Sequence, residues 1–195
     1  MRLPQTENLS CHHLRCTARD AAEVQAFETL YPETGSGLER YLKRHALADE
    51  DAGVMRTYLV RFKATRELVG FFSLKAGLVS LNEVPMQQTA VFDTVPGVEL
   101  ANFAVNGAFA QRYNARGLGF LLFSGLIEPF VREHAKTIGI YMLYLFALPF
   151  PKLLRTYENY GFRRLTPTDE KLLHQRLKPA YDDSCIFMYQ LLGNT

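Results

Sequence analysis

The sequence predicts an α/β fold (an α+β mixed sheet) in which parallel and antiparallel strands are combined with crossover helices. The first observation is the order of the expected elements: a strand, helices, a β-hairpin, then strand, helix, strand, helix and strand. The second is a nearly continuous apolar run over 138–147, typical of a strand buried on both faces. The third is a globular composition, 48% hydrophobic and 22% charged, over 195 residues. We therefore expect a single domain over residues 1–195.

In the first half of the chain, β-branched and aromatic runs bounded by turn residues predict strands, and apolar residues at helical spacing predict helices. The expected strands are 9–17, 55–62 and 67–74, the last two forming a hairpin and the third continuing through 78–81. Asp20 is expected to cap a helix over 21–30. The Gly- and Ser-bearing segment 32–37 is expected to be a loop, followed by a helix from Leu38 that ends near Asp49.

In the second half, 84–96 is expected to be a loop with an extended middle, and 98–105 and 138–147 are expected to be strands. A long amphipathic helix is predicted over 117–136, with a kink at Pro129. A short helix over 151–160 is expected to stop at Gly161, and alternation over 184–192 predicts the last strand. The charged residues 169–171 are expected to face solvent.

Composition restricts the class of protein. A net charge of +2 is too small to argue for nucleic-acid binding by itself. Three cysteines at irregular spacing do not form a disulfide framework, which favours a reducing compartment. The first residues lack the apolar core of a signal peptide, and the longest apolar stretch is too short for a membrane span. We expect a cytoplasmic protein without membrane contact, and leave open whether it forms a homodimer.

The most informative segment is Asn114-Ala115-Arg116-Gly117-Leu118-Gly119, between an expected strand and an expected helix. Such a junction presents backbone N–H groups at the positive end of a helix dipole, which suits an anionic phosphate. A dinucleotide fingerprint would need a third glycine where Leu122 stands. A Walker loop would need Lys and Ser or Thr where Phe120 and Leu121 follow Gly119. Both of these phosphate-binding loops are therefore excluded.

This segment resembles the pyrophosphate loop Q/R-x-x-G-x-G/A of the GNAT (GCN5-related) N-acetyltransferases, with Asn114 in place of the usual Gln or Arg. The segment 156–162, Thr-Tyr-Glu-Asn-Tyr-Gly-Phe, is similar to the LYEKLGF segment of the same family. The order of elements also matches, and the sharpest motifs lie between 98 and 162. The resemblance implies a GNAT-like acyl-CoA N-acyltransferase fold and acetyl-CoA as co-substrate.

The resemblance also implies which residues contact acetyl-CoA. The pyrophosphate would lie against the loop, and the pantetheine arm against backbone groups of the strand before it. The implied contact residues are Phe103, Ala104, Val105, Arg112, Asn114, Ala115, Arg116, Gly117, Leu118 and Gly119. The Asn that the family usually has at the start of the next helix is replaced by Phe150, a second departure that puts that contact in doubt.

Two residues are candidates for proton transfer. Glu99 lies in an apolar strand, where Glu is uncommon, and the resemblance makes it the general base that takes a proton from the substrate amine. The alternative is a solvent-facing Glu at the start of the strand. Tyr157 falls on the family's general acid, a neutral phenol that protonates the leaving thiolate. The alternative is an aromatic core residue that shares a helix face with Leu153.

No metal site is expected. Cysteines and histidines gather in 11–16, but the adjacent His12 and His13 of a strand would point to opposite faces. No second Cys/His pair stands nearby in the sequence to complete a zinc site.

The leading hypothesis is an acetyl-CoA-dependent N-acetyltransferase, in which a primary amine of a small molecule or peptide attacks the thioester directly in a ternary complex. One alternative is a GNAT-type toxin that acetylates aminoacyl-tRNA, because 53–60 and 69–74 look similar to such toxins. The basic residues Arg40, Lys43 and Arg44 suit tRNA, whereas the acidic run 49–51 beside them does not. The other alternative is a non-catalytic acyl-CoA-binding protein on the same fold. The sequence specifies neither the acceptor nor whether activity is retained.

Overall fold

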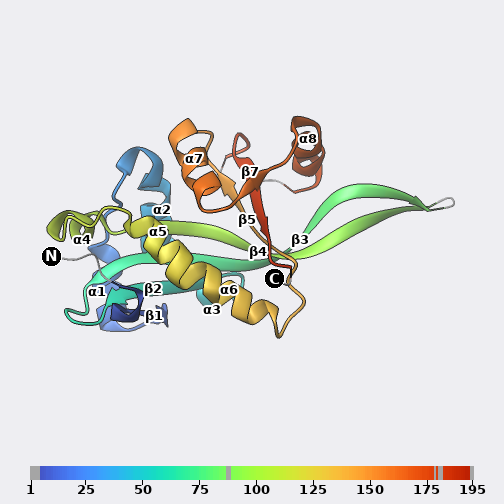
Figure 1. Cartoon of the computed structure of the whole chain (residues 1–195). Helices are drawn as coiled ribbons and strands as arrows, with labels where there is room; N and C mark the ends of the chain where they lie inside the picture. The colour runs from blue at the N-terminus through green and yellow to red at the C-terminus, as the bar shows by residue number, and fades with distance from the viewer. Residues whose placement is uncertain (1–4, 87–88, 178, 180–181, 194–195) are drawn as a thin grey trace. The chain divides into compact units, whose positions relative to one another are not determined.

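The computed structural model describes residues 5–86, 89–177, 179 and 182–193 (Figure 1). The chain forms two compact units. The first comprises Met1–Lys75 and Leu100–Phe130, and the second comprises Ala76–Glu99 and Val131–Thr195. The expectation of a single domain over 1–195 stays a prediction, and each unit is described by itself.

Within the described residues, the strands form a seven-stranded mixed sheet in the order β1-β2-β3-β4-β5-β7-β6. Their bounds are β1 Leu9–His13, β2 Arg56–Phe62, β3 Leu68–Met86, β4 Thr89–Val105, β5 Met142–Ala147, β6 Arg163–Arg164 and β7 Ile186–Leu191. In the first unit β1 and β3 both pair antiparallel with β2. In the second unit β5 pairs parallel with β4 and antiparallel with β7, and β7 pairs antiparallel with β6. The α/β expectation with a mixed sheet is confirmed.

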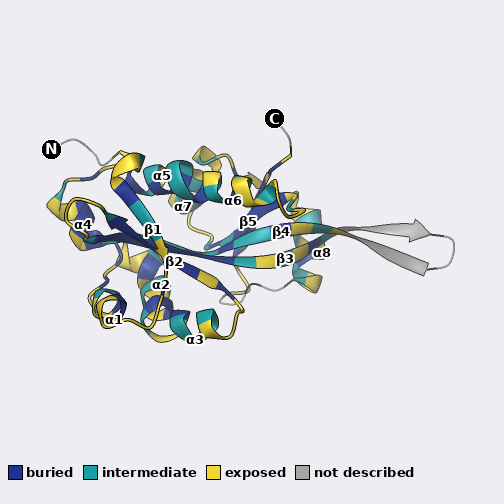
Figure 2. Ribbon diagram, turned by 90° about the horizontal axis from the view of Figure 1, so that it is seen from below, coloured by how far each residue is buried: buried dark blue, intermediate teal, exposed yellow. Residues whose placement is uncertain are grey.

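In the first unit, helices cover both faces of the strands (Figure 2). One face is covered by α1 (Ala18–Gln25), α2 (Pro32–Arg44) and α3 (Ala46–Asp51). Their apolar side chains form one core cluster with β2, β3 and β4, which includes Val24, Tyr41, Leu42, Leu59 and Phe71. On the other face, Tyr58 and Phe72 stack at 4.9 Å between ring centroids, and Phe130 packs edge-on against Tyr58. Alternation along β2 and β3 therefore supplies two separate apolar layers.

The second unit has its own core. Val79 of β3, Met142 and Tyr144 of β5 and Phe187 of β7 cluster with Leu173 of α8 (Pro167–Arg176). The aromatic rings of Tyr144 and Phe187 stack at 5.4 Å. Helix α7 (Pro151–Asn159) contributes the buried Leu154 and ends before Gly161, whose φ of +91° fits glycine. The expected short helix stopped by Gly161 is confirmed.

Two expectations for the first helices are wrong. Asp20 does not cap a helix over 21–30; Thr17 caps α1 by accepting a hydrogen bond from the Asp20 N–H, and the Asp20 carboxylate is buried. The segment 32–37 is not a loop but the first turns of α2, which begins at Pro32. Proline suits the first helical position, and Gly35 lets the helix approach Thr29, whose Oγ1 would lie 2.7 Å from an added Cβ.

Three expectations for later segments also need correction. Much of 84–96 belongs to β3 and β4, not to a loop. The helix over 117–136 is divided into α5 (Leu118–Leu122), a π-helical turn (Phe123–Ile127) and α6 (Glu128–Ala135), so that the irregularity expected at Pro129 is a π-turn just before it. The charged residues 169–171 lie on α8, and Glu170 accepts a hydrogen bond from the Phe187 N–H at 2.7 Å instead of only facing solvent. Helix α4 (Gly107–Arg112) was not expected.

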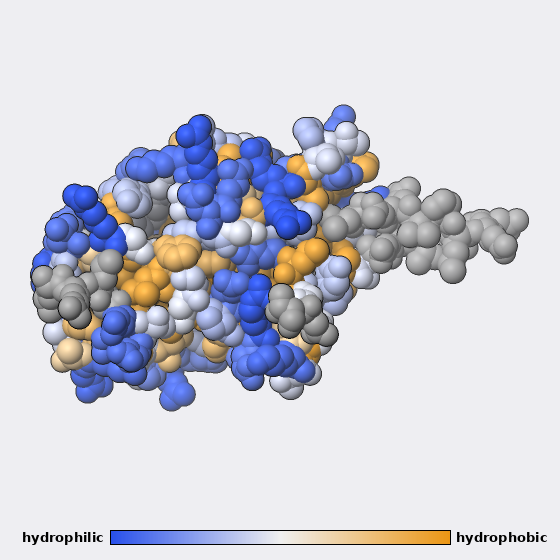
Figure 3. Space-filling view, viewed as in Figure 1, coloured by the Kyte–Doolittle hydropathy of each residue, from blue (hydrophilic) through white to orange (hydrophobic). Residues whose placement is uncertain are grey.

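Hydrophilic residues cover much of the surface seen in Figure 3, with apolar residues gathered in a few places between them. The exposed large apolar side chains include Leu78, Phe120, Ile138 and Phe150. Isolated apolar groups of this kind are normal on a protein surface. Among the described residues, every helix is too short or too polar to cross a bilayer.

We expect Gly70→Ala to destabilise the protein by about 1–3 kcal/mol. A Cβ at Gly70 would lie 2.6 Å from the carbonyl oxygen of Ala104 and 3.0 Å from a methyl group of Leu122, so β3 and β4 would have to shift. Gly37→Ala is the matched control, since nothing lies within 4 Å of its added Cβ. On helix α2 that change should stabilise by about 0.5–1 kcal/mol. Urea denaturation measures both, and equal stability of the two variants would contradict the close approach at Gly70.

Candidate active site

The loop predicted to bind phosphate is built on two capped turns. Asn106, directly after β4, caps α4 by accepting hydrogen bonds from the N–H groups of Ala108 and Phe109 at 3.0 and 3.3 Å. Its own N–H donates to the Val69 carbonyl at 2.8 Å. At the other end of α4, Ala115 is buried and its N–H donates to the Ala110 carbonyl at 2.9 Å. The backbone is thus held at both ends of α4, which leads into the segment 114–119.

Two residues of this segment have left-handed backbone conformations. Asn114 has φ +46°, and Gly117, which precedes α5, has φ +73°. Asn is enriched in this conformation among non-glycine residues, which gives a physical reason for Asn where the family has Gln or Arg. Nothing lies within 4 Å of a Cβ added to Gly117. The start of α5 is therefore open, with helical N–H groups that have no preceding carbonyl within the helix.

The two arginines near the loop differ in their surroundings. Arg112 forms an ion pair with Glu67, and the Tyr113 hydroxyl donates to the same carboxylate at 2.6 Å. Arg112 thus ties the end of α4 to the start of β3. Arg116 is exposed and has no acidic partner among the described residues, so its charge is available to an anion. Of the two predicted cations, Arg116 fits a pyrophosphate contact better.

The strand residues expected beside the pantetheine arm lie at the end of β4. Ala104 is buried, and Phe103 and Val105 are partly exposed. The Val105 carbonyl already accepts a hydrogen bond from the Leu30 N–H at 3.1 Å. A ligand would therefore meet the N–H of Val105 more readily than its carbonyl, in the manner of strand addition.

In the second unit, the predicted base Glu99 lies in register with Tyr144 across the parallel β4–β5 pair. Glu99 is partly exposed, and Tyr144 is 1% exposed. Burial raises the pKa of the Tyr144 phenol, and the nearby Glu99 carboxylate raises this pKa further. Tyr144 therefore stays neutral at physiological pH.

Tyr144 is a neighbour of the candidate base that sequence reasoning missed. Its ring occupies space left by two glycines, one on the adjacent strand β4 and one on β3, the next strand beyond it. A Cβ on Gly97 of β4 would lie 3.0 Å from the ring, and one on Gly77 of β3 would lie 2.0 Å from the hydroxyl. The sequence contained two signals of this arrangement, the two glycines and a Tyr inside an apolar run. Only the register of the strands shows that these residues lie together.

The predicted acid Tyr157 lies on α7, also in the second unit. Its ring packs edge-on against Tyr160 at 6.0 Å and against Phe162 at 5.8 Å. Burial raises the pKa of the Tyr157 phenol, with a smaller contribution from Tyr160. No hydrogen bond of its hydroxyl is found among the described residues. The phenol thus stays protonated at neutral pH and is not used by the surrounding fold, so both the catalytic and the packing interpretations stay open.

The remaining expectations concern Phe150 and metal. Phe150 precedes α7, is 45% exposed and makes no side-chain capping hydrogen bond, so it supplies no polar contact of the kind the family's Asn would give. Across the described ranges, no group of three or more His, Cys, Asp or Glu side chains is placed to hold a metal ion.

No protein-family model matches the chain. Several solved structures are similar to it. A tyrosine-to-phenylalanine mutant of KacT is 17% identical with a TM-score of 0.65, covering 95% of both chains. A similar mutant of the AtaT toxin, bound to the C-terminus of the antitoxin AtaR and acetyl-CoA, is 14% identical with a TM-score of 0.60, covering 94% of this chain and 93% of that one. AtaT complexed with acetyl-methionyl-tRNAfMet is 17% identical with a TM-score of 0.62, covering 92% and 93%.

These similarities extend over nearly the whole chain and establish the fold. AtaT and KacT are GNAT-fold acetyltransferases. The chain therefore has the GNAT fold, as its loop and its order of elements predicted, and that expectation is confirmed.

We expect Gly117→Glu to abolish the rise in melting temperature that acetyl-CoA gives the native protein. The substitution places a side chain and a negative charge in the open space before α5. Gly139→Glu is the control, because its added Cβ also meets nothing within 4 Å but lies away from the loop sequence. Thermal-shift titration measures both variants. Undiminished stabilisation of a folded Gly117→Glu protein would place the phosphate site elsewhere.

Proposed function

We propose that this protein is an acetyl-CoA-dependent N-acetyltransferase whose acceptor is the α-amino group of an aminoacyl-tRNA. The observation that carries the proposal is the open, left-handed turn at Gly117 before α5, within the fold of the AtaT and KacT toxins. The fit to a pyrophosphate is supported by the exposed Arg116 beside it. AtaT itself has been solved with acetyl-CoA, in agreement with a coenzyme A ligand for this fold.

The choice of acceptor departs from our leading expectation of a small molecule or peptide amine. The similarity to AtaT complexed with acetyl-methionyl-tRNAfMet favours the tRNA alternative. The chemistry is consistent with it. An α-amino group titrates near 7.7–8.0 and a lysine amine near 10.4, so a larger share of the former is neutral at physiological pH. The partly exposed Glu99 carboxylate is the group that we propose takes the proton from the remainder.

The roles proposed for the residues follow from this acceptor. Acetyl-CoA supplies the thioester that the amine attacks. Glu99 accepts the proton that the amine loses as its nitrogen bonds to the acetyl carbon. Tyr157 gives a proton to the sulfur as the carbon–sulfur bond breaks, so the products are an amide and a neutral thiol. Backbone N–H groups at the end of β4 stabilise the charge on the thioester oxygen.

The test of the function measures coenzyme A release from acetyl-CoA with three acceptors: charged tRNA, the same tRNA without its amino acid, and a panel of small amines. We expect coenzyme A release with the charged tRNA alone. We also expect the amino acid recovered by hydrolysis of that tRNA to carry the acetyl group on its α-nitrogen. Faster release with a small amine would restore our first expectation. Binding of acetyl-CoA without release for any acceptor would indicate a non-catalytic acyl-CoA-binding protein.

We expect Tyr157→Phe to lower the acetyl-transfer rate by a factor on the order of 10²–10⁴, the usual contribution of a positioned general acid. The substitution keeps the aromatic ring and its contacts with Tyr160 and Phe162, so stability and acetyl-CoA affinity should change little. Tyr160→Phe removes the corresponding hydroxyl three residues later and serves as the control. Single-turnover rates and melting temperatures of both variants decide the assignment. An unimpaired Tyr157→Phe enzyme would make this Tyr a packing residue.

A further inference from the structure

The first unit contains a pocket of about 710 Å³ that the proposed chemistry does not use. It lies where β1 ends, α1 begins and β2 turns into β3, and its lining includes Arg15, Arg19, Asp20, Arg61, Lys63 and Arg66. Its volume is within the range of ligand-binding clefts. Five of these six residues are cations, so the charge balance of the pocket decides what it can bind.

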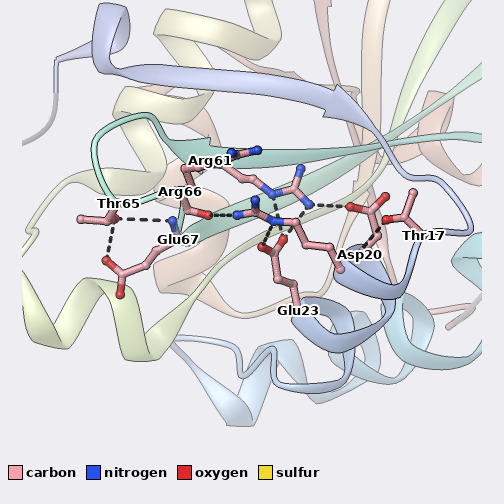
Figure 4. A network of polar contacts seen from close by, with 8 residues as sticks. Thr17, Asp20, Glu23, Arg61, Thr65, Arg66 and Glu67 are labelled. Carbon is pink, nitrogen blue, oxygen red and sulfur yellow. Dashed lines mark hydrogen bonds and ion pairs between the residues drawn. The ribbon is translucent and has the colours of Figure 1, made fainter.

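The nearby acidic groups, Asp20 in the pocket lining and Glu23 one helical turn further along α1, are already engaged (Figure 4). The buried Arg61 donates to Asp20 at 2.7 Å and to Glu23 at 2.8 Å. Asp20 also accepts from the Arg15 N–H at 3.0 Å, and Glu23 also pairs with Arg19 at 2.8 Å. Each carboxylate thus holds two donors. The two negative charges of this pair balance the positive charges of Arg61 and Arg19.

The cations at the rim have no such compensation. Arg15, Lys63 and Arg66 are exposed, and none has an acidic partner within the part of the chain that the structure describes. Lys63 Nζ donates only to the Glu7 carbonyl, at 2.6 Å. The backbone of Arg66 is fixed at φ +60°, and its carbonyl accepts from Arg19 at 2.9 Å. Arg15, Lys63 and Arg66 therefore give the pocket three uncompensated positive charges.

We propose that this pocket binds phosphate groups of an RNA backbone. The cations come from two segments, Arg15 before α1 and Lys63 and Arg66 in the turn between β2 and β3, and all three line the pocket. Exposed cations spread in this way suit several phosphates in succession more than one compact anion held by converging buried donors. Exposed Lys and Arg that contact phosphates fix the position of a nucleic acid without reading its sequence. The identity of the RNA as tRNA rests on the proposed function, whereas the phosphate site does not.

The test uses binding of uncharged tRNA to the full chain by fluorescence anisotropy at several salt concentrations. The pocket variant combines Arg15→Gln, Lys63→Gln and Arg66→Asn, the last chosen because Asn tolerates the left-handed backbone. The control variant combines Arg155→Gln, Arg163→Gln and Lys171→Gln, three exposed cations of the second unit, and removes the same amount of charge.

We expect the pocket variant to bind tRNA roughly ten- to a hundredfold more weakly at low salt. The slope of log K against log salt should fall by roughly 2–3, which is about 0.7–0.9 for each phosphate that the variant no longer neutralises. The control variant should keep both values. Equally weakened tRNA binding in the two variants would overturn the proposal, as would unchanged tRNA binding in the pocket variant. It would also be overturned if inorganic triphosphate saturated the pocket and tRNA did not compete with it.

A parallel measurement of acetyl transfer distinguishes a failure of this proposal from a failure of the proposed function. Acetyl transfer to a surrogate small amine should be unchanged in the pocket variant, because none of its three positions belongs to the loop or to the proton-transfer groups. Loss of tRNA binding in an enzyme that acetylates no charged tRNA would uphold the pocket and reject the acceptor. Acetylation of charged tRNA that is equally fast in the pocket variant and the native protein would uphold the acceptor and reject the pocket as an RNA-binding site.

Discussion

The constraint on which the candidate site depends is the backbone hydrogen bonding where β4 ends and α5 begins. A buried strand end and a buried helix start both leave N–H and C=O groups that need partners. The chain satisfies the first set through the Asn106 cap and the contact between Leu30 and Val105. It then turns through the left-handed Asn114 and Gly117, which leaves the amides at the start of α5 open. We propose that these amides bind the pyrophosphate, which requires no catalytic side chain.

The charged side chains fall into two groups: those that are paired within the fold and those that remain available to a ligand. Arg61 is 8% exposed and would be costly to bury alone, and Asp20 and Glu23 compensate it. Arg112 is held by Glu67. Arg116 in the loop and Arg15, Lys63 and Arg66 at the pocket have no acidic partner among the described residues. A net charge of +2 concealed this contrast, because it sums paired and unpaired cations alike.

The sequence predicted most strands of the sheet, because their apolar periodicity is a local property, and it located the loop through Gly117 and Gly119. It failed where a distant contact decides the local structure. The glycines of 32–37 indicated a loop, yet Gly35 serves close packing against Thr29 inside a helix. Asp20 looked like a helix cap because its partner Arg61 lies 41 positions away. Tyr144 escaped notice because Gly77 and Gly97, which make room for it, lie on two other strands.

Two tyrosines of the second unit, Tyr144 and Tyr157, illustrate how environment can assign roles that residue type alone leaves open. Tyr157 and Tyr144 are both phenols whose pKa is raised by burial, so neither supplies a base at neutral pH. They differ in what surrounds the ring. Tyr144 is almost fully buried and lies in register with Glu99 across the β4–β5 pair. Tyr157 is packed through its ring alone, and its hydroxyl makes no hydrogen bond among the described residues. A phenol of the second kind keeps its proton until an anion forms next to it, which is the property a general acid for a leaving thiolate requires.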